Sequence, residues 1–525
     1  MHSEPRSFNR LAANDSSTDL LASLTHAKLI RIDRVTDDVE PWLAESWTRS
    51  DDGLRYTITL RKGVTFADGH AFSSADVVFS FDAAYAVPLS SDALSINGKR
   101  LSVTAPDPLT VVVTFPSLFA PGLRILDNLW ILPRHRLEPA LREKTFDRAW
   151  TVSTPPSDIT GLGPFVLTEY VPGQRLTCVR NAHYWRTDAK GVTLPYLDRV
   201  VIEIVPEENT ELLRLQSGQS DITNSEMPPE AYATMKRAAD AGQVQLFDLG
   251  VGRDADTLWF NLKPGILRDD PRAAWLQRDE LRRAISLAVD RQAFADAVFF
   301  GAGVPIYGPI TPGNRKWYAA SVQHPPHDPA RAKQLLASIG LADRDGDGVL
   351  EDAARHPVRF TVITQKGRRS QERGTAILRD ELKKIGVTVD VAMLEATAVI
   401  ERIISGRYEA VYFRPAFSDS DPANNMDFWL SSGGQHFWNM GQKTPATDWE
   451  RQIDDLTRRQ VQTLDEKERI RLFAEVQAIY AEHEPAVFFV APRVFTAASP
   501  RVVNVTPAVT RPQMLWAPDT VAVKH

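Results

Sequence analysis

In the first half of the chain, apolar and polar positions follow patterns that predict β-strands. Residues 54–60 (LRYTITL) alternate between the two classes, and residues 109–115 (LTVVVTF) form a short apolar run typical of a buried strand. The same reasoning gives strands at 165–170, 175–179 and 200–205. One helix is expected among them, because Ser73 can cap its start and Asp76 is placed where an acid favours a helix N-terminus.

In the second half, helical and strand patterns alternate. Residues 279–300 have apolar side chains at helical spacing and predict one amphipathic helix, and residues 447–483 predict a long helix broken near Leu464 and Asp465. Between them, strands are expected at 358–364, 387–393 and 409–413, with helices at 370–385 and 399–404. A last buried strand is expected at 486–491. Strands that alternate with helices indicate βαβ units and an α/β fold.

The change of pattern occurs twice. The strand-rich half ends near residues 250–256, and a proline-rich β pattern returns near residues 491–495. Two such crossings imply two lobes with a cleft between them. A chain of 525 residues is long enough for more than one core, which agrees with this division.

Composition and charge exclude several classes of protein. The net charge of −6 argues against a nucleic-acid binder, and a single cysteine, Cys178, excludes an intrachain disulfide and a cysteine-rich zinc site. There is no apolar run of membrane-spanning length. The first residues, MHSEPRSFNRLAANDSS, lack the basic and apolar regions of a signal peptide, so we expect a mature or cytosolic N-terminus.

One short motif suggests a metal. Asp343, Asp345 and Asp347 occupy positions 1, 3 and 5 of a calcium-binding loop, with Gly348 at the turn. Position 12, which normally supplies a bidentate glutamate, is Ala354. An acidic turn between a helix and a strand explains the same residues, so calcium remains a weak candidate and no cofactor is expected.

No pattern indicates catalysis. The chain has no GxSxG nucleophile turn, no GxxxxGK[ST] phosphate loop and no strand-linked GxGxxG. Acids are plentiful, but nothing marks a pair of them as catalytic. We therefore expect a protein that is not an enzyme, with a hydrolase as a remote alternative.

The most suggestive stretch for binding is residues 412–439, which follow a predicted strand and mix aromatic, charged and amide side chains. Loops at strand ends are a usual place for binding sites. The candidates here are Arg414, Phe417, Asp419, Trp438 and Asn439. The alternative is that Phe428 and Trp429 form the core face of a short helix. A second strand-end loop, ITQKGRRS at 363–370, could hold a ligand carboxylate.

Several motifs together resemble one family. Residues 43–81, LAESWTRSDDGLRYTITLRKGVTFADGHAFSSADVVFSF, look like the signature of the family 5 extracellular solute-binding proteins, the oligopeptide- and dipeptide-binding components of ABC transporters. Further matches are GLGPF at 161–165, Arg180-Asn181 with Tyr184-Trp185, LWFN at 258–261 and LRRAISLAVDRQ at 281–292. These motifs span nearly the whole chain.

The resemblance implies a fold and a location. The fold would be a two-lobed α/β periplasmic-binding-protein fold, type II and cluster C-like, with an extra subdomain in the first lobe. The expected division is 1–41, 161–252 and 492–525 for lobe 1, 42–160 for the subdomain and 253–491 for lobe 2. The protein would be a periplasmic or extracytoplasmic monomer that encloses a small solute between its lobes by hinge closure and delivers it to a membrane permease.

The resemblance also implies ligand contacts. In the peptide binders an acid after the strand at 409–413 pairs with the ligand's amino group, so Asp419 or Asp421 is the candidate, and Lys366 or Arg368 would hold the ligand carboxylate. Relatives also carry oligosaccharides, opines and metal chelates. For an oligosaccharide, Phe417 and the two tryptophans would stack on the sugar while two asparagines form hydrogen bonds; these four residues are Trp259, Trp438, Asn261 and Asn439.

Overall fold

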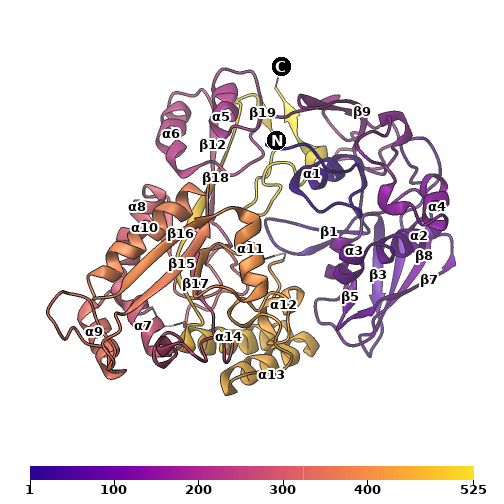
Figure 1. Ribbon diagram of the computed structural model, residues 1–525. Coiled ribbons are helices and arrows are strands. Elements are labelled where there is room, and N and C mark those ends of the chain that lie inside the picture. The colour runs from indigo at the N-terminus through magenta and orange to yellow at the C-terminus, as the bar shows by residue number, and fades with distance from the viewer. Residues whose placement is uncertain (323, 418, 525) are drawn as a thin grey trace. The chain divides into compact units, whose positions relative to one another are not determined.

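The computed structural model describes residues 1–322, 324–417 and 419–524 (Figure 1). The chain forms two compact units. Unit 1 comprises Met1–Leu249 and Val494–His525, and unit 2 comprises Gly250–Arg493. Both crossings lie within three residues of the boundaries expected between the lobes. No helix among the described residues is both long and apolar enough to span a membrane.

Unit 1 is built on small antiparallel sheets. One has the strand order β3-β4-β8-β7 and another the order β11-β10-β9. The bounds are β3 Ala44–Arg49, β4 Arg55–Leu60, β7 Ser102–Asp107, β8 Thr110–Thr114, β9 Phe165–Val171, β10 Arg175–Arg180 and β11 Arg199–Glu203. Two shorter strands, β1 (Ile30–Ile32) and β2 (Val39–Pro41), pair with each other. The strands expected in this half are confirmed, and the alternating β4 buries Tyr56, Ile58 and Leu60 on one face.

The helices of unit 1 are short. They are α1 Ser16–Thr25, α2 Ser74–Tyr85, α3 Pro88–Ala93, α4 Arg134–Arg142, α5 Glu208–Gln216 and α6 Tyr232–Asp240. The expected start of α2 is confirmed, because Ser73 and Asp76 form a capping box. Residues 42–160, expected as a subdomain, contain the β3-β4-β8-β7 sheet and helices α2 to α4; their status as a separate subdomain stays a prediction.

Unit 2 is an α/β unit around a larger sheet with the order β12-β18-β13-β17-β15-β16, in which β14 also pairs with β18. Most of β12 and the end of β18 from Val494 onward belong to unit 1, and the other strands of this sheet belong to unit 2. The bounds are β12 Gln245–Val251, β13 Asp256–Phe260, β14 Gly303–Pro305, β15 Arg359–Gln365, β16 Thr388–Leu394, β17 Ala410–Phe413 and β18 Ala486–Ala498. Strand β15 runs parallel to both β16 and β17, which confirms the βαβ units. Helices α10 (Arg369–Lys383) and α11 (Ala396–Ser405) connect these strands and lie alongside them (Figure 1).

The remaining helices of unit 2 agree with the sequence except at one point. Residues 279–300 form two helices, α7 (Asp279–Ala288) and α8 (Arg291–Phe299), rather than the single helix expected. The break arises because Asp290 accepts hydrogen bonds from the backbone of Gln292 and Ala293 and starts a second helix. The break near Leu464 is confirmed. The other bounds are α9 Pro329–Ser338, α12 Met426–Trp429, α13 Asp448–Gln462 and α14 Glu466–His483.

The unit 2 sheet separates two apolar cores. Along β13, Leu258 and Phe260 belong to one core and Trp259 to the other, as the alternation of a strand requires. The first core includes residues of α7, α8 and α10, and the second includes residues of α11, α12, α13 and α14. This arrangement decides which of the predicted binding residues can reach a ligand.

Candidate functional site

Trp259 was predicted to stack on a ligand, but its side chain is fully buried. Its ring lies 5.8 Å from that of Phe428 and is stacked at 6.2 Å on Trp438, which is itself 1% exposed. Both tryptophans belong to the second core of unit 2. Both rings are thus packed inside the core, and neither offers a surface to a solute. Phe428 and Trp429, for which a core face was the alternative, are buried on the short helix α12.

The two asparagines are also used within the chain. Asn261 Nδ2 donates to the carbonyl oxygens of Gly406 and Tyr408, at 2.7 and 2.9 Å. Asn439 is 3% exposed, and its Nδ2 donates to Gln442 Oε1 at 2.5 Å. Both side chains are almost fully buried and donate hydrogen bonds within the chain. A role of Asn261 and Asn439 in ligand binding therefore stays a prediction that no exposed surface supports.

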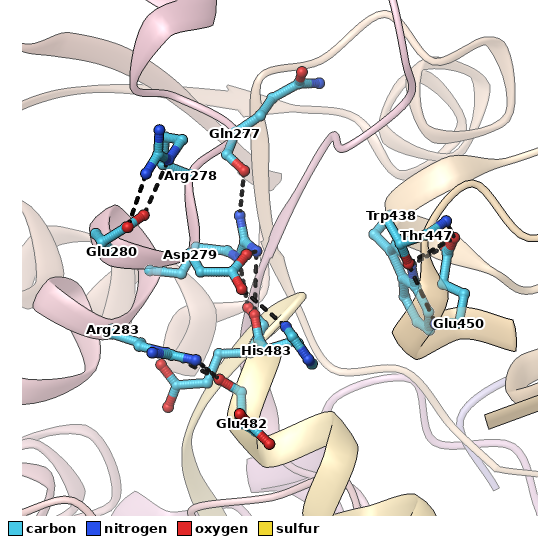
Figure 2. Close-up of polar contacts among 12 residues, drawn as sticks. Gln277, Arg278, Asp279, Glu280, Arg283, Trp438, Thr447, Glu450, Glu482 and His483 are labelled. Carbon is cyan, nitrogen blue, oxygen red and sulfur yellow. Dashed lines mark hydrogen bonds and ion pairs between the residues drawn. The ribbon is translucent and has the colours of Figure 1, made fainter. Parts of the chain in front are cut away.

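Trp438 takes part in a buried polar cluster around Glu450 (Figure 2). Its Nε1 donates to Glu450 Oε1 at 3.1 Å, and His436 Nε2 lies 3.0 Å from the same oxygen. Burial raises the pKa of Glu450, but the hydrogen bonds from His436, Trp438 and Gln442 outweigh burial and lower it to about 2. The cluster also caps α13, because Glu450 forms a capping box with Thr447. Its function is structural.

The carboxylate of Asp421 is likewise buried and bonded to groups of the chain itself. Its carboxylate receives two hydrogen bonds from the guanidinium of Arg469, at 2.6 and 2.9 Å, and both side chains are less than a tenth exposed. One of its oxygens also accepts from the backbone of Ala423. Of the two acids predicted to meet a ligand amino group, Asp421 is thus occupied by an internal partner.

The other predicted residues lie where a solute could reach them. Strands β15 and β17 are parallel neighbours, so the loops after them lie at the same edge of the sheet. Lys366 and Arg368 follow β15 and are exposed, and Lys366 forms an exposed ion pair with Glu395 at 3.2 Å. These two residues share that edge with Arg414, Phe417 and Asp419 from the loop after β17.

The loop after β17 is partly ordered by its own contacts. Arg414 Nε donates to the buried Asp256 at 2.8 Å, and its side chain remains about one fifth exposed. Phe417 packs its ring against Phe428, with centroids 4.9 Å apart. Asp419 Oδ1 accepts from the backbone of Asp421 at 2.8 Å. The loops after β15 and β17 therefore present cations and a carboxylate at the same edge of the sheet, and internal contacts hold the loop after β17 in place.

The acidic turn of the weak calcium prediction brings Asp343, Asp345 and Asp347 together, with ligand oxygens within 4.8 Å of one another. All three residues are exposed. Asp343 accepts from the backbone of Gly346 and Gly348, at 2.7 and 3.1 Å. Such bonds are usual in acidic turns, so the cluster has an explanation without calcium.

A pocket that the sequence did not predict lies wholly in unit 1. Its volume is about 70 Å³, and it is formed by α1, β1 and its flanking residues, the segment around Asp127, and the C-terminal residues 512–519. Cationic and aromatic side chains dominate the lining: Lys28, Arg31, Arg34, Trp42, Trp130 and Trp516. Three acids, Asp19, Asp127 and Asp519, balance the cations.

Cationic side chains lie over two of the tryptophan rings of this pocket. The guanidinium groups of Arg31 and Arg186 lie over the Trp42 ring, 3.9 and 4.1 Å from its centroid, and Lys28 lies 4.4 Å from that of Trp130. No local motif reveals this arrangement, because its members come from distant segments. The only signal in the sequence is the spacing of Lys28, Arg31 and Arg34 about a strand, and that pattern is not specific.

His26, in the lining of this pocket, gives the protein a predictable pH dependence. Burial lowers its pKa from 6.5 to about 4. The folded protein therefore binds fewer protons than the unfolded chain between these pH values, and the free energy of unfolding falls as the pH falls through that window. The loss at pH 4 is about 3 kcal/mol.

Urea unfolding of the wild type and His26→Gln between pH 7 and pH 4 measures this contribution. The variant lacks the titrating group, so its profile should be flatter than that of the wild type by about 3 kcal/mol over the window. Parallel profiles would show that His26 does not titrate as its burial requires.

Comparison with solved structures identifies the fold. A solved structure of the periplasmic binding protein MelB of Agrobacterium fabrum, in complex with stachyose, matches 100% of this chain and 84% of that chain, with a TM-score of 0.77 and 22% identity. Unit 1, unit 2 and the α/β topology are thus those of a two-lobed periplasmic binding protein.

Sequence comparison gives the family. The family model "Bacterial extracellular solute-binding proteins, family 5 Middle" matches residues 38–437. The chain belongs to this family, as the motifs at 43–81 indicate.

Two relatives illustrate the range of the family. A "Probable ABC transporter-binding protein" of Deinococcus radiodurans is 29% identical over 400 residues, which are 73% of this chain and 66% of that relative. The oligopeptide-binding protein AppA of Bacillus subtilis is 28% identical over 412 residues, 76% of this chain and 69% of AppA. A structure of AppA with a nonapeptide matches 100% of this chain and 98% of AppA, with a TM-score of 0.74 and 24% identity.

Proposed function

We propose that this chain is the substrate-binding component of an ABC importer, which captures a peptide-like solute outside the cytoplasm and presents it to a membrane permease. The family match over residues 38–437 carries the importer part of the proposal. The naming of AppA as an oligopeptide-binding protein supports a peptide-like solute. A ligand that favours one closed arrangement of the lobes shifts the population toward it by its difference in affinity, which is how such a receptor signals loading.

The edge of the unit 2 sheet supports the peptide assignment. Lys366 and Arg368 are exposed cations suited to a ligand carboxylate, and Asp419 is a carboxylate suited to an ammonium group. The three residues lie in loops after the parallel strands β15 and β17. Asp421 is left out of the ligand contacts because Arg469 already occupies its carboxylate.

Isothermal titration of trialanine and N-acetyl-trialanine into the wild type and Asp419→Asn tests the proposal. Acetylation removes the charge of the peptide amino group, so it should weaken binding to the wild type at least tenfold and have little effect on the variant. Asp427→Asn is the matched control, because Asp427 is an exposed acid eight residues further along the chain. If both peptides bind the wild type and Asp419→Asn with equal affinity, Asp419 does not contact the peptide amino group. If neither peptide binds the wild type, the proposal of a peptide-like solute is wrong.

An oligosaccharide or another small solute is the second candidate. The observation in its favour is the tryptophan-lined pocket of unit 1, because flat aromatic rings suit the C–H faces of sugars. The solved structure of MelB with stachyose shows that this fold accommodates such a ligand.

A further inference from the structure

A short hairpin in unit 1 has an asparagine followed by a glycine at its turn. Strands β5 (Ser95–Ile96) and β6 (Lys99–Arg100) pair in antiparallel register, and Asn97 and Gly98 form the two-residue turn between them. Both turn residues have positive φ, 51° for Asn97 and 72° for Gly98, which is the geometry of a type I′ turn. No other asparagine of the chain precedes a glycine, so this pair is unique in the sequence.

The tip of this hairpin is open to water, whereas its base is not. Asn97, Gly98 and both residues of β6 are exposed. A Cβ atom at Gly98 would meet no heavy atom within 4 Å beyond its chain neighbours, so nothing crowds the backbone there. At the base, Leu94 and Leu101 are buried and hold the flanking chain in place. The exposed part is therefore confined to the turn and β6.

An asparagine and the glycine after it can react with each other. The backbone nitrogen of Gly98 attacks Cγ of Asn97 and forms a new C–N bond, which closes a cyclic succinimide. The side-chain nitrogen leaves as ammonia with the proton that the Gly98 nitrogen gives up. Water then cleaves one of the two bonds that join this nitrogen to a carbonyl carbon: cleavage at Cγ leaves aspartate, and cleavage at the main-chain carbon leaves isoaspartate. Glycine favours the attack because it has no side chain to hinder its nitrogen.

The pairing of β5 with β6 opposes this reaction only weakly. The attack requires the peptide bond after Asn97 to rotate toward the Asn97 side chain, so the type I′ turn must first open. The hairpin has only two residue pairs, and isolated two-stranded hairpins are at best marginally stable in water. Arg100 holds the base, because its guanidinium donates to the carbonyl oxygen of Tyr85 at 2.9 Å and to Ser91 Oγ at 3.2 Å. The tip can thus open locally while the rest of unit 1 stays folded.

We propose that Asn97 is a site of spontaneous deamidation, at which the folded protein acquires aspartate or isoaspartate with water as the co-reactant. Either product adds a negative charge to the tip of the hairpin. In isoaspartate the backbone runs through the former side chain, so the longer turn disrupts the register of β5 and β6. The proposal concerns unit 1 alone and does not depend on the solute that the protein binds.

Incubation of the folded full chain at pH 8, followed by peptide mass spectrometry, tests the proposal. Asn97 should convert to a mixture of aspartate and isoaspartate at least tenfold faster than Asn209, because only the Asn97 turn combines easy opening with an unhindered nitrogen. Asn209 is the internal control, since it is also exposed but precedes Thr210. Gly98→Asp should slow the conversion of Asn97 at least tenfold, because aspartate tolerates the left-handed conformation but its side chain hinders the nitrogen.

The outcomes are distinct. Isoaspartate that forms at position 97 faster than at Asn209, and more slowly in Gly98→Asp, supports the proposal. It is overturned if Asn97 converts no faster than Asn209, or if Gly98→Asp and the wild type convert at the same rate. Aspartate without isoaspartate would also overturn it, because direct hydrolysis of the amide would then replace the attack by Gly98. The rate and products of the wild type decide the matter if Gly98→Asp does not fold.

Discussion

Replacing Asp421 with alanine is expected to lower the free energy of unfolding by about 3 to 5 kcal/mol, because it leaves the buried guanidinium of Arg469 without its counter-charge. The carboxylate receives two hydrogen bonds from Arg469, at 2.6 and 2.9 Å, and Arg469 lies over the ring of Trp317. Chemical unfolding monitored by circular dichroism measures the change.

The matched control is Glu475→Ala. Glu475 pairs with Arg471 on the exposed face of α14, and both side chains are about half exposed. Exposed ion pairs contribute about 0 to 1 kcal/mol, so this variant should unfold nearly as the wild type does. The double variant Asp421→Leu with Arg469→Met removes both charges and should recover much of the loss. If Asp421→Ala is as stable as Glu475→Ala, the pair does not stabilise unit 2, and Asp421 returns to the candidates for ligand contact.

Replacing Trp259 with alanine is expected to cost about 3 to 5 kcal/mol, because it opens a cavity in the second core of unit 2. The indole has no exposed surface, and its aromatic neighbours come from β17, α12, the segment after α12 and β18. The loss should appear in the unfolding of the protein with no solute present. A variant that folds normally but no longer binds its solute would contradict this and assign Trp259 to the binding surface.

Ile404→Ala provides the comparison on the surface. Ile404 is 63% exposed on α11, so its truncation removes little buried area and should change the free energy of unfolding by no more than about 0.5 kcal/mol. A large effect of both variants would indicate that the cost arises from something other than the cavity.

Much of the fold could be predicted because it depends on local patterns. The alternation along β4, the capping box at Ser73 and the breaks between helices are each determined by a few neighbouring residues. The error at 279–300 has the same origin, since apolar spacing continues through Asp290 while the side chain of Asp290 ends one helix and starts the next. The spacing of apolar residues shows where a helix is favoured, whereas capping residues decide where it ends.

The candidate site was less predictable because binding surfaces and cores use the same residue types. Trp259 lies within a strand and Trp438 in the segment after another, and tryptophan is a residue type that also stacks on ligands. Their burial depends on packing partners such as Phe488 and Tyr480, which are distant in the sequence. The unit 1 pocket presents the converse case, because Lys28 and Asp519 have no local feature that marks them before the chain has folded.

The two crossings of the chain also set an order for its synthesis. Unit 2 is one uninterrupted stretch whose ends are neighbours, since Gly252 donates to the carbonyl oxygen of Pro492 at 2.8 Å. Unit 1 begins first but needs the segment from Val494 onward to be finished. Domains fold as units while the ribosome works, so unit 2 can fold before unit 1 closes. Trp516 and Asp519 lie in this later segment of unit 1, so the unit 1 pocket is completed only after the segment has joined the rest of its unit.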